Sequence, residues 1–148
     1  MSQERAGVDL ETSLGYLLKE ASSALRVAME SVLRPLGMTV THYSCLELLA
    51  QRPGLSNSEL ARGAFVTRQS MNVLLQALER DGYVSRAEEA AIGRALPTRL
   101  TAYGRRELEK ASVAVRSVED RMRSGMSEVE QADTLRALQG MVRNLRGE

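Results

Sequence analysis

The apolar residues near the start of the chain repeat at the spacing of a helix. Between residues 14 and 32 they recur every three or four positions, at Leu14, Leu18, Ala21, Leu25, Ala28 and Val32, so they lie on one face of a predicted helix. Pro35 and Gly37 end this helix. Thr39 then caps a second, shorter helix, which stops at the turn formed by residues 52–54.

Two further helices are predicted close together in the middle of the chain. Ser56 and Glu59 have the spacing of a capping box, in which each side chain bonds to the other residue's backbone N–H, so a short helix begins here. Thr67 caps a longer helix over residues 68–80, and Gly82 supplies its C-cap. A short helix, a turn and a longer helix opened by small polar residues form the layout of a helix-turn-helix.

Helical spacing divides the longer of these helices into two faces. The inward face is apolar and consists of Met71, Leu74, Leu75 and Leu78. The outward face is polar and consists of Arg68, Gln69, Ser70, Asn72 and Gln76. Arginine can pair with guanine, asparagine and glutamine with adenine, and serine and threonine with phosphates. Spacing alone is more often typical of a solvated surface, so the interpretation depends on the segment after this helix.

A predicted β-hairpin comes directly after it. Residues 83–87 alternate like a strand, residues 88–93 form a loop, and residues 95–100 return as a second strand. Pro97 cannot donate a hydrogen bond inside a sheet, so its strand lies at an edge. A two-stranded hairpin after a helix-turn-helix is a wing, and Arg86 and Arg94 are candidate DNA contacts on it.

Long amphipathic helices are predicted at both ends. Thr101 caps a long helix, residues 125–127 interrupt it, and a last helix comes after them. These helices exceed what one compact core needs, so we expect them to pack against a second copy; an intramolecular helical bundle is the alternative. The expected fold is mostly α, a single domain over residues 1–148. It consists of a winged helix-turn-helix with a two-stranded β-wing (about 39–104) and dimerisation helices at the N- and C-terminal ends (about 1–35 and 105–148).

Composition and charge agree with this outline. The 148 residues are 43% apolar and only 3% aromatic, a mixture that favours helix. The net charge of +1 hides a basic middle, since residues 52–106 hold nine basic and five acidic residues. All nine are arginines, whose planar fork suits phosphates and guanine edges. A GC-rich genome also produces many arginines, so this count alone does not establish that the middle of the chain binds DNA.

Several classes of protein are disfavoured. No apolar run approaches the roughly 18 residues that span a bilayer, and no signal peptide is recognisable, so we expect a cytoplasmic protein without membrane contact. One cysteine and one histidine are too few for a disulfide or the usual four-ligand zinc site. No nucleophile motif or phosphate-binding glycine loop is present, so we predict no enzyme activity, no metal and no cofactor.

Over nearly its full length the chain resembles the MarR family of transcriptional regulators. The resemblance rests on the order and spacing of five segments, at residues 36–39, 55–61, 66–72, 78–84 and 99–104. It implies a homodimer that binds double-stranded DNA at a palindromic operator, with repression as the usual outcome. It also implies base or phosphate contacts by Thr67, Arg68, Gln69, Ser70 and Asn72, and a wing contact by Arg94. The sequence departs from the family at residues 92–94, which lack the usual acidic residue, and at Val73, where arginine is common.

The resemblance further implies a small anionic aromatic effector, such as salicylate. Tyr16, Arg26, His42 and Tyr43 offer rings and hydrogen-bond donors for such a ligand. Two alternatives stay open: a winged-helix module that binds proteins, and a redox-sensing regulator that uses Cys45. Cys45 lies in an apolar run, where a thiol behaves as a small hydrophobic group of low reactivity.

Overall fold

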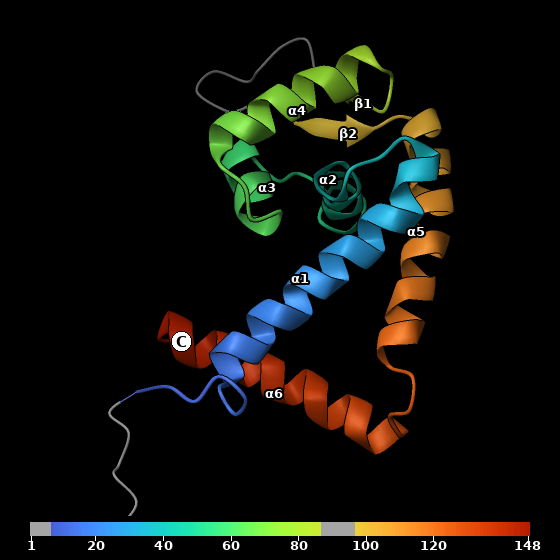
Figure 1. Cartoon of the computed structure of the whole chain (residues 1–148). Helices are drawn as coiled ribbons and strands as arrows, with labels where there is room; N and C mark the ends of the chain where they lie inside the picture. Colours follow the sequence, from blue (N-terminus) through green and yellow to red (C-terminus); the bar gives the residue numbers. More distant parts are fainter. Residues whose placement is uncertain (1–6, 87–96) are drawn as a thin grey trace, which may run out of the picture. The chain divides into compact units, whose positions relative to one another are not determined.

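The structure, a computed structural model, describes residues 7–86 and 97–148. The helices that the sequence predicts are all present, in the predicted order, with the wing strands between them (Figure 1). Arg94 lies outside the described residues. The elements are α1 (Leu14–Leu33), η1 (Arg34–Leu36), α2 (Val40–Gln51), α3 (Asn57–Gly63), α4 (Arg68–Arg80), β1 (Val84–Arg86), β2 (Thr98–Leu100), α5 (Ala102–Met122) and α6 (Glu128–Arg146).

Local side-chain hydrogen bonds set the starts of the central helices. The Ser56 hydroxyl accepts the Glu59 N–H (3.2 Å), and the Glu59 carboxylate accepts the Ser56 N–H (3.0 Å), so the predicted capping box opens α3. The hydroxyls of Thr39 and Thr67 accept the N–H three residues on, at 3.1 and 3.0 Å. These donors have no partner inside their helices, so each cap stabilises the fold by about 1 kcal/mol.

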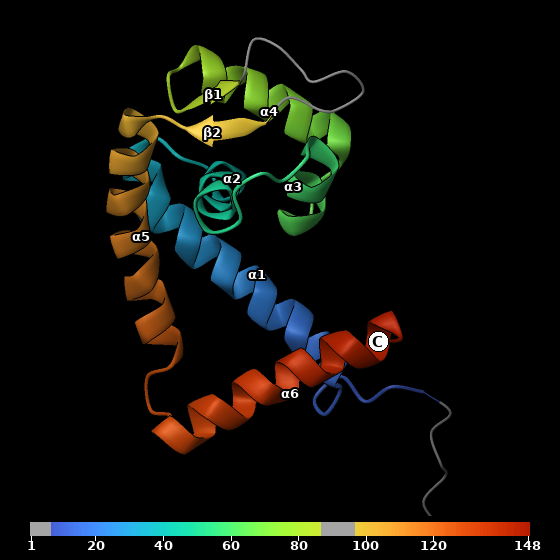
Figure 2. The ribbon, with the colours of Figure 1, turned by 180° about the vertical axis from the view of Figure 1, so that it is seen from behind.

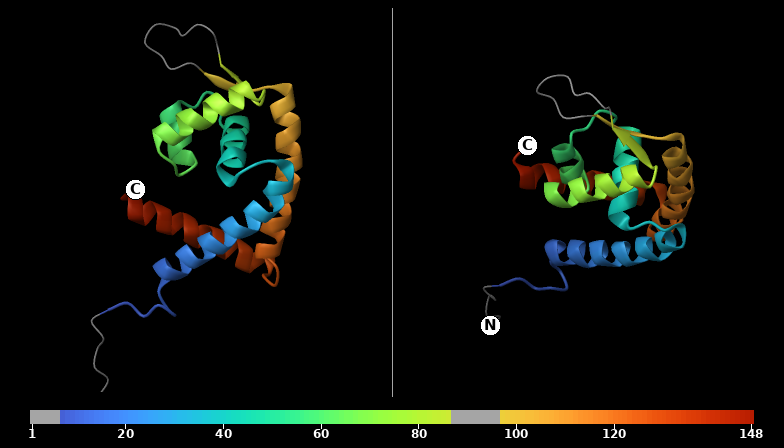
Figure 3. Two further views of the ribbon diagram at one scale, coloured as in Figure 1. Left: turned by 45° about the horizontal axis from the view of Figure 1, so that its top comes forward. Right: turned by 90° about the horizontal axis from the view of Figure 1, so that it is seen from above.

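Contacts between residues divide the chain into two compact units, with the boundary between Val115 and Arg116. In the first unit α2 contacts α1, α3 and β2, whereas α4 contacts α3 and β1. Figures 1 and 2 show α2 nearly end-on, with α3 to one side and α4 close to the strands. Two further views place α4 at the surface of this unit (Figure 3).

An aliphatic core holds α4 by its inward face. Met71, Leu75 and Leu78 are buried, as the sequence predicts, and Leu74 packs against the same core while partly buried. A fully buried side chain of this size contributes about 1.5–3 kcal/mol. The position of α4 is therefore fixed from within, while its other face stays open to solvent. The core is completed by residues from the neighbouring elements, among them Leu46, Leu49, Leu60, Val84, Leu100 and Leu108.

The wing begins as an antiparallel pair of short strands. Val84 is opposite Leu100, and Arg86 is opposite Thr98. Val84, Leu100 and Thr98 are buried. Because side chains alternate along a strand, Arg86 lies on the same inward face as Val84.

A close approach between backbones connects α4, the wing and α5. Gly104 lies so near Tyr83 that an added Cβ would come within 2.1 Å of the Tyr83 carbonyl oxygen. The Thr101 N–H donates to that same carbonyl (3.1 Å), and the Thr101 hydroxyl donates to the Gly82 carbonyl (2.5 Å) and accepts the Gly104 N–H (3.0 Å). Thr101 therefore caps α5, as predicted, and also fastens α5 to the chain that leaves α4.

The turn between α3 and α4 contains an unusual residue. Phe65 has φ = 60°, and no other non-glycine residue among those described has a positive φ. Its side chain is 87% exposed. The left-handed conformation is unfavourable for a residue with a Cβ, and the exposed ring gains little from packing. Phe65 therefore lowers the stability of the folded state.

We predict that Phe65→Gly raises the free energy of unfolding by about 0.5–1 kcal/mol. Glycine relieves about 1–2 kcal/mol of backbone strain, partly offset by the greater freedom of glycine in the unfolded chain. Urea unfolding at a fixed protein concentration measures the change. Phe65→Ala is the matched control, because it removes the ring but keeps the Cβ. An equal gain in Phe65→Ala would show that the ring, not the backbone, causes the strain.

Candidate functional site

The outward face of α4 is mostly polar. Arg68, Gln69, Ser70, Asn72 and Gln76 are all exposed, as is the N-cap residue Thr67. The structure thus brings together the six predicted contact residues on and before this helix. All of them offer hydrogen-bonding groups of the kinds that read base edges or hold phosphates.

Two of these side chains are held by α3. The Asn57 amide donates to the Asn72 side-chain oxygen (2.7 Å), and an Arg68 guanidinium nitrogen donates to the Ser58 hydroxyl (3.2 Å). These bonds fix the orientation of Asn72 and Arg68 before any ligand arrives. Nothing in the sequence marks Asn57 and Ser58 as partners of α4, since both read as ordinary residues of the first turn of α3.

The N-terminus of α4 carries a small hydroxyl cluster. The Thr67 hydroxyl accepts the Ser70 N–H (3.0 Å) and donates to the Ser70 hydroxyl at 2.9 Å. The partial positive charge at a helix N-terminus and the two exposed hydroxyls suit a phosphate oxygen.

Arg86 has different surroundings from the predicted contacts on α4. Its Nε and Nη2 atoms are buried and have no hydrogen-bond partner, and the Thr98 hydroxyl opposite it is buried and unpartnered as well. Part of the guanidinium is therefore withdrawn from solvent, and this geometry does not favour a DNA contact for Arg86. The strand pattern could have indicated this position. Side chains alternate along a strand, so Arg86 lies on the same face as the buried Val84.

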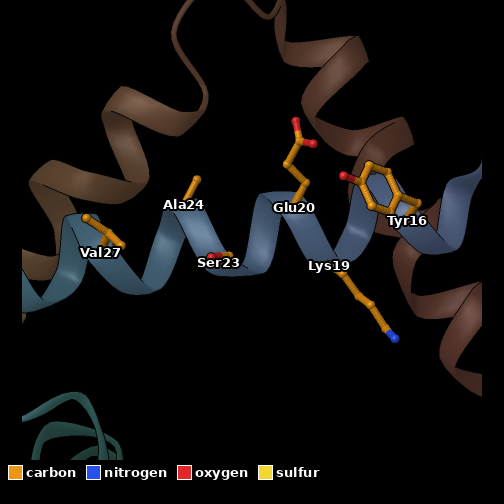
Figure 4. A pocket seen from close by; sticks show the side chains of 6 residues that line it. All are labelled: Tyr16, Lys19, Glu20, Ser23, Ala24 and Val27. Atoms are coloured by element: carbon orange, nitrogen blue, oxygen red, sulfur yellow. The ribbon is translucent and has the colours of Figure 1, made fainter. Parts of the chain in front are cut away.

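The four candidate effector residues do not converge in the described part of the chain. Tyr16 lines an open hollow whose walls all come from α1 (Figure 4). Tyr43 lines a different hollow, of about 220 Å³, with further residues of α2 and with Arg52 and Gly63. Arg26 is exposed and pairs with Glu30 at 3.1 Å on the same helix.

His42 is a core residue. It is only 9% exposed, and its ring meets Tyr83 edge-on with centroids 4.6 Å apart. Burial lowers the pKa of His42, although the carboxylate of Asp81 opposes the shift. Burial therefore favours the neutral form of the imidazole. Within residues 7–86 and 97–148 no group of three acidic, His or Cys side chains could hold a metal, and no helix is long and apolar enough to cross a membrane.

Cys45 lies in the core beneath the wing. Its side chain is fully buried, and burial raises the pKa of the thiol to about 12, with the charge of Arg86 acting in the opposite direction. Because the thiolate is the reactive form, a thiol with this pKa is almost inert at neutral pH.

A helix-turn-helix whose second helix exposes base-reading side chains, with a two-stranded wing after it, defines a winged helix-turn-helix regulator. A model of the MarR family matches residues 36–95. The HTH-type transcriptional repressor Rv2887 of Mycobacterium tuberculosis is 40% identical over 133 residues, which are 90% of this chain and 96% of that protein. The chain belongs to the MarR family.

Solved structures agree with this assignment. The MarR family protein Rv2887 in complex with salicylic acid matches with a TM-score of 0.73 and 40% identity, over 88% of this chain and 96% of that one. Its complex with DNA matches with a TM-score of 0.72 and 38% identity, over 88% and 98%. The predicted family and fold class are confirmed. The protein is a transcriptional regulator, and MarR family regulators are in general not enzymes.

We predict that Cys45 reacts with a chromogenic disulfide reagent at least about a hundredfold more slowly in the native protein than in the urea-unfolded chain, because the native thiol is buried and protonated. The colour released over time at neutral pH measures both rates, with Cys45→Ala as the blank. Rapid labelling of the native protein, or loss of DNA binding on peroxide treatment in the wild type but not in Cys45→Ala, would restore the redox-sensing alternative.

Proposed function

We propose that this protein is a homodimeric repressor that binds a palindromic operator in the cytoplasm and is released by a small anionic aromatic ligand. The observation that carries the proposal is the outward face of α4, where exposed Arg, Gln, Asn and Ser side chains stand on a helix fixed by a buried core. A helix of this kind enters the major groove with its N-terminal residues against the base edges.

The contacts can be assigned by chemistry. We assign guanine recognition to Arg68 and adenine recognition to Gln69, Asn72 or Gln76, since these pairings are two-pronged. The hydroxyls of Thr67 and Ser70 are assigned to a phosphate, and Arg94 to the DNA backbone or minor groove beside the wing.

The apolar stripes of the terminal helices support a homodimer. No residue of α6 is buried in the single chain, and Val129, Leu135, Leu138, Val142 and Leu145 of its stripe are all exposed. Only Leu33 is buried in α1. Exposed apolar stripes on this scale mark an interface. In a symmetric dimer the two copies of α4 would reach half-sites about one helical turn, roughly 34 Å, apart.

Effector release is proposed by analogy with the salicylic acid complex of Rv2887. Arg26 offers an exposed cation, and Tyr16 and Tyr43 offer partly exposed rings. His42 is buried, and we assign it a role in supporting such a site rather than in direct contact.

A module that binds proteins is not favoured, because its recognition helix would present an apolar face. The two functions differ in their response to salt. DNA affinity falls steeply as salt rises, since each phosphate contact releases counterions. A protein contact through an apolar face has no such dependence.

We predict that Arg68→Ala lowers operator affinity about 5- to 150-fold and changes the preferred base, because a two-pronged pair with guanine is lost. Arg94→Ala should lower affinity with little change in sequence preference. Gel shifts with a duplex selected from a random pool by the wild type measure both effects. Arg52→Ala, which removes an exposed arginine elsewhere in the same unit, is the control and should bind normally. Unchanged affinity in both test variants would overturn the site assignment.

We predict that millimolar salicylate lowers the affinity of the wild type for the same duplex. Salicylamide, which keeps the ring but lacks the carboxylate charge, is the matched control and should have little effect. Arg26→Gln should weaken the response to salicylate, because it removes the cation that pairs with the carboxylate. Binding that is equally insensitive to salicylate and to other aromatic carboxylates would contradict effector release.

A further inference from the structure

Val73 occupies the centre of the outward face of α4. Each residue of a helix turns about 100° around the axis, so Val73 lies opposite both Met71 and Leu75, two positions away on either side. Those two side chains are fully buried, whereas Val73 is 63% exposed. Gln69 and Gln76, one turn to either side, are exposed on the same face.

The stability of the helix does not account for a valine at this position. β-Branched residues are poorer helix formers than Ala, Leu, Arg or Lys, and exposed helix positions favour those residues. Exposed large apolar side chains are also rare in this part of the chain. Between residues 36 and 86, and from 97 to 104, only Phe65, Val73 and Tyr103 are in this class. Val73 alone of these lies on α4.

The major groove contains one apolar group at the base edges, the C5 methyl of thymine; the other groups there are hydrogen-bond donors and acceptors. Valine cannot donate or accept a hydrogen bond, so a polar base edge pressed against it would lose its water without gaining a partner. The side chains around Val73 have the opposite property, since Gln69, Asn72 and Gln76 can each pair with polar edges.

We propose that Val73 selects thymine within each operator half-site by packing its methyl groups against the C5 methyl of that base. This inference rests on the proposed function, since it assumes that α4 lies in the major groove. It adds a specificity-determining residue that reads shape and apolar contact, beside neighbours that read hydrogen bonds.

The test removes one methyl group from the DNA and, separately, two from the protein. The probe is a duplex selected from a random pool by the wild-type protein. Each thymine of its half-sites is replaced in turn by deoxyuridine, which lacks only the C5 methyl. For the wild type, deoxyuridine at one particular position of the half-site should lower affinity. We expect a loss of about fourfold when one half-site is changed and about fifteenfold when both are, because each changed half-site loses one buried methyl contact.

Val73→Ala should abolish this difference, so that thymine and deoxyuridine duplexes bind equally. Alanine favours helix more than valine does, so the variant folds. Val113→Ala is the matched control, because Val113 is a helical valine with 64% exposure on α5. It should keep the full preference for thymine. Gln76→Ala should weaken binding while keeping that preference as well.

The outcomes separate two failures. If the wild type selects no sequence from the pool, the proposed function is wrong. If it selects a sequence but no thymine-to-deoxyuridine change lowers its affinity, or if Val73→Ala retains the full preference for thymine, the proposed function stands and the role of Val73 is wrong. The role is also wrong if Val73→Ala lowers affinity for both duplexes by the same factor. The ratio of the two affinities would then be that of the wild type, so the preference for thymine would not come from Val73.

Discussion

The arrangement of the first unit depends on the close approach of Gly104 to the Tyr83 carbonyl. A side chain at residue 104 would collide with that oxygen, and the hydrogen bonds of Thr101 hold both backbones in place. Three elements meet here: the end of α4, the base of the wing and the start of α5. The direction in which α5 leaves the first unit is therefore tied to the end of α4 and the base of the wing by a few backbone contacts.

The two faces of α4 have separate physical roles. The inward face contributes aliphatic burial, which fixes where the helix lies but carries no information about a DNA sequence. The outward face contributes little to stability, so its residues are free to be chosen for recognition. Phe65 lies just before this helix and adds strain instead of stability. Winged-helix proteins of this size can tolerate such a cost because several buried leucines offset it.

Much of the fold could be predicted because its signals are local. A helix cap such as Ser56 with Glu59, or Thr67 with Ser70, involves residues only three positions apart. The inward face of α4 follows from helical spacing within that helix alone. The effector residues could not be predicted in the same way. Tyr16 and Tyr43 lie on different helices, and nothing in their spacing states which hollow each one lines. The bonds between Asn57 and Asn72 and between Arg68 and Ser58 join residues ten or more positions apart, so they depend on how two helices cross. Arg86 differs for another reason. Its charge suggested an exposed position, whereas the two-residue period of its strand places it on the inward face, where it is half-buried.

The bonds between α3 and α4 also bear on the entropic cost of DNA binding. Arg68 and Asn72 are already ordered in the free protein by their bonds to Ser58 and Asn57. A guanidinium has five N–H donors and an amide oxygen has two lone pairs, so each side chain can keep its partner on α3 and still bond to a base. Side chains that are ordered before binding lose less conformational entropy when they bind. At the proposed DNA contacts, these two bonds would therefore reduce the entropic cost of recognition.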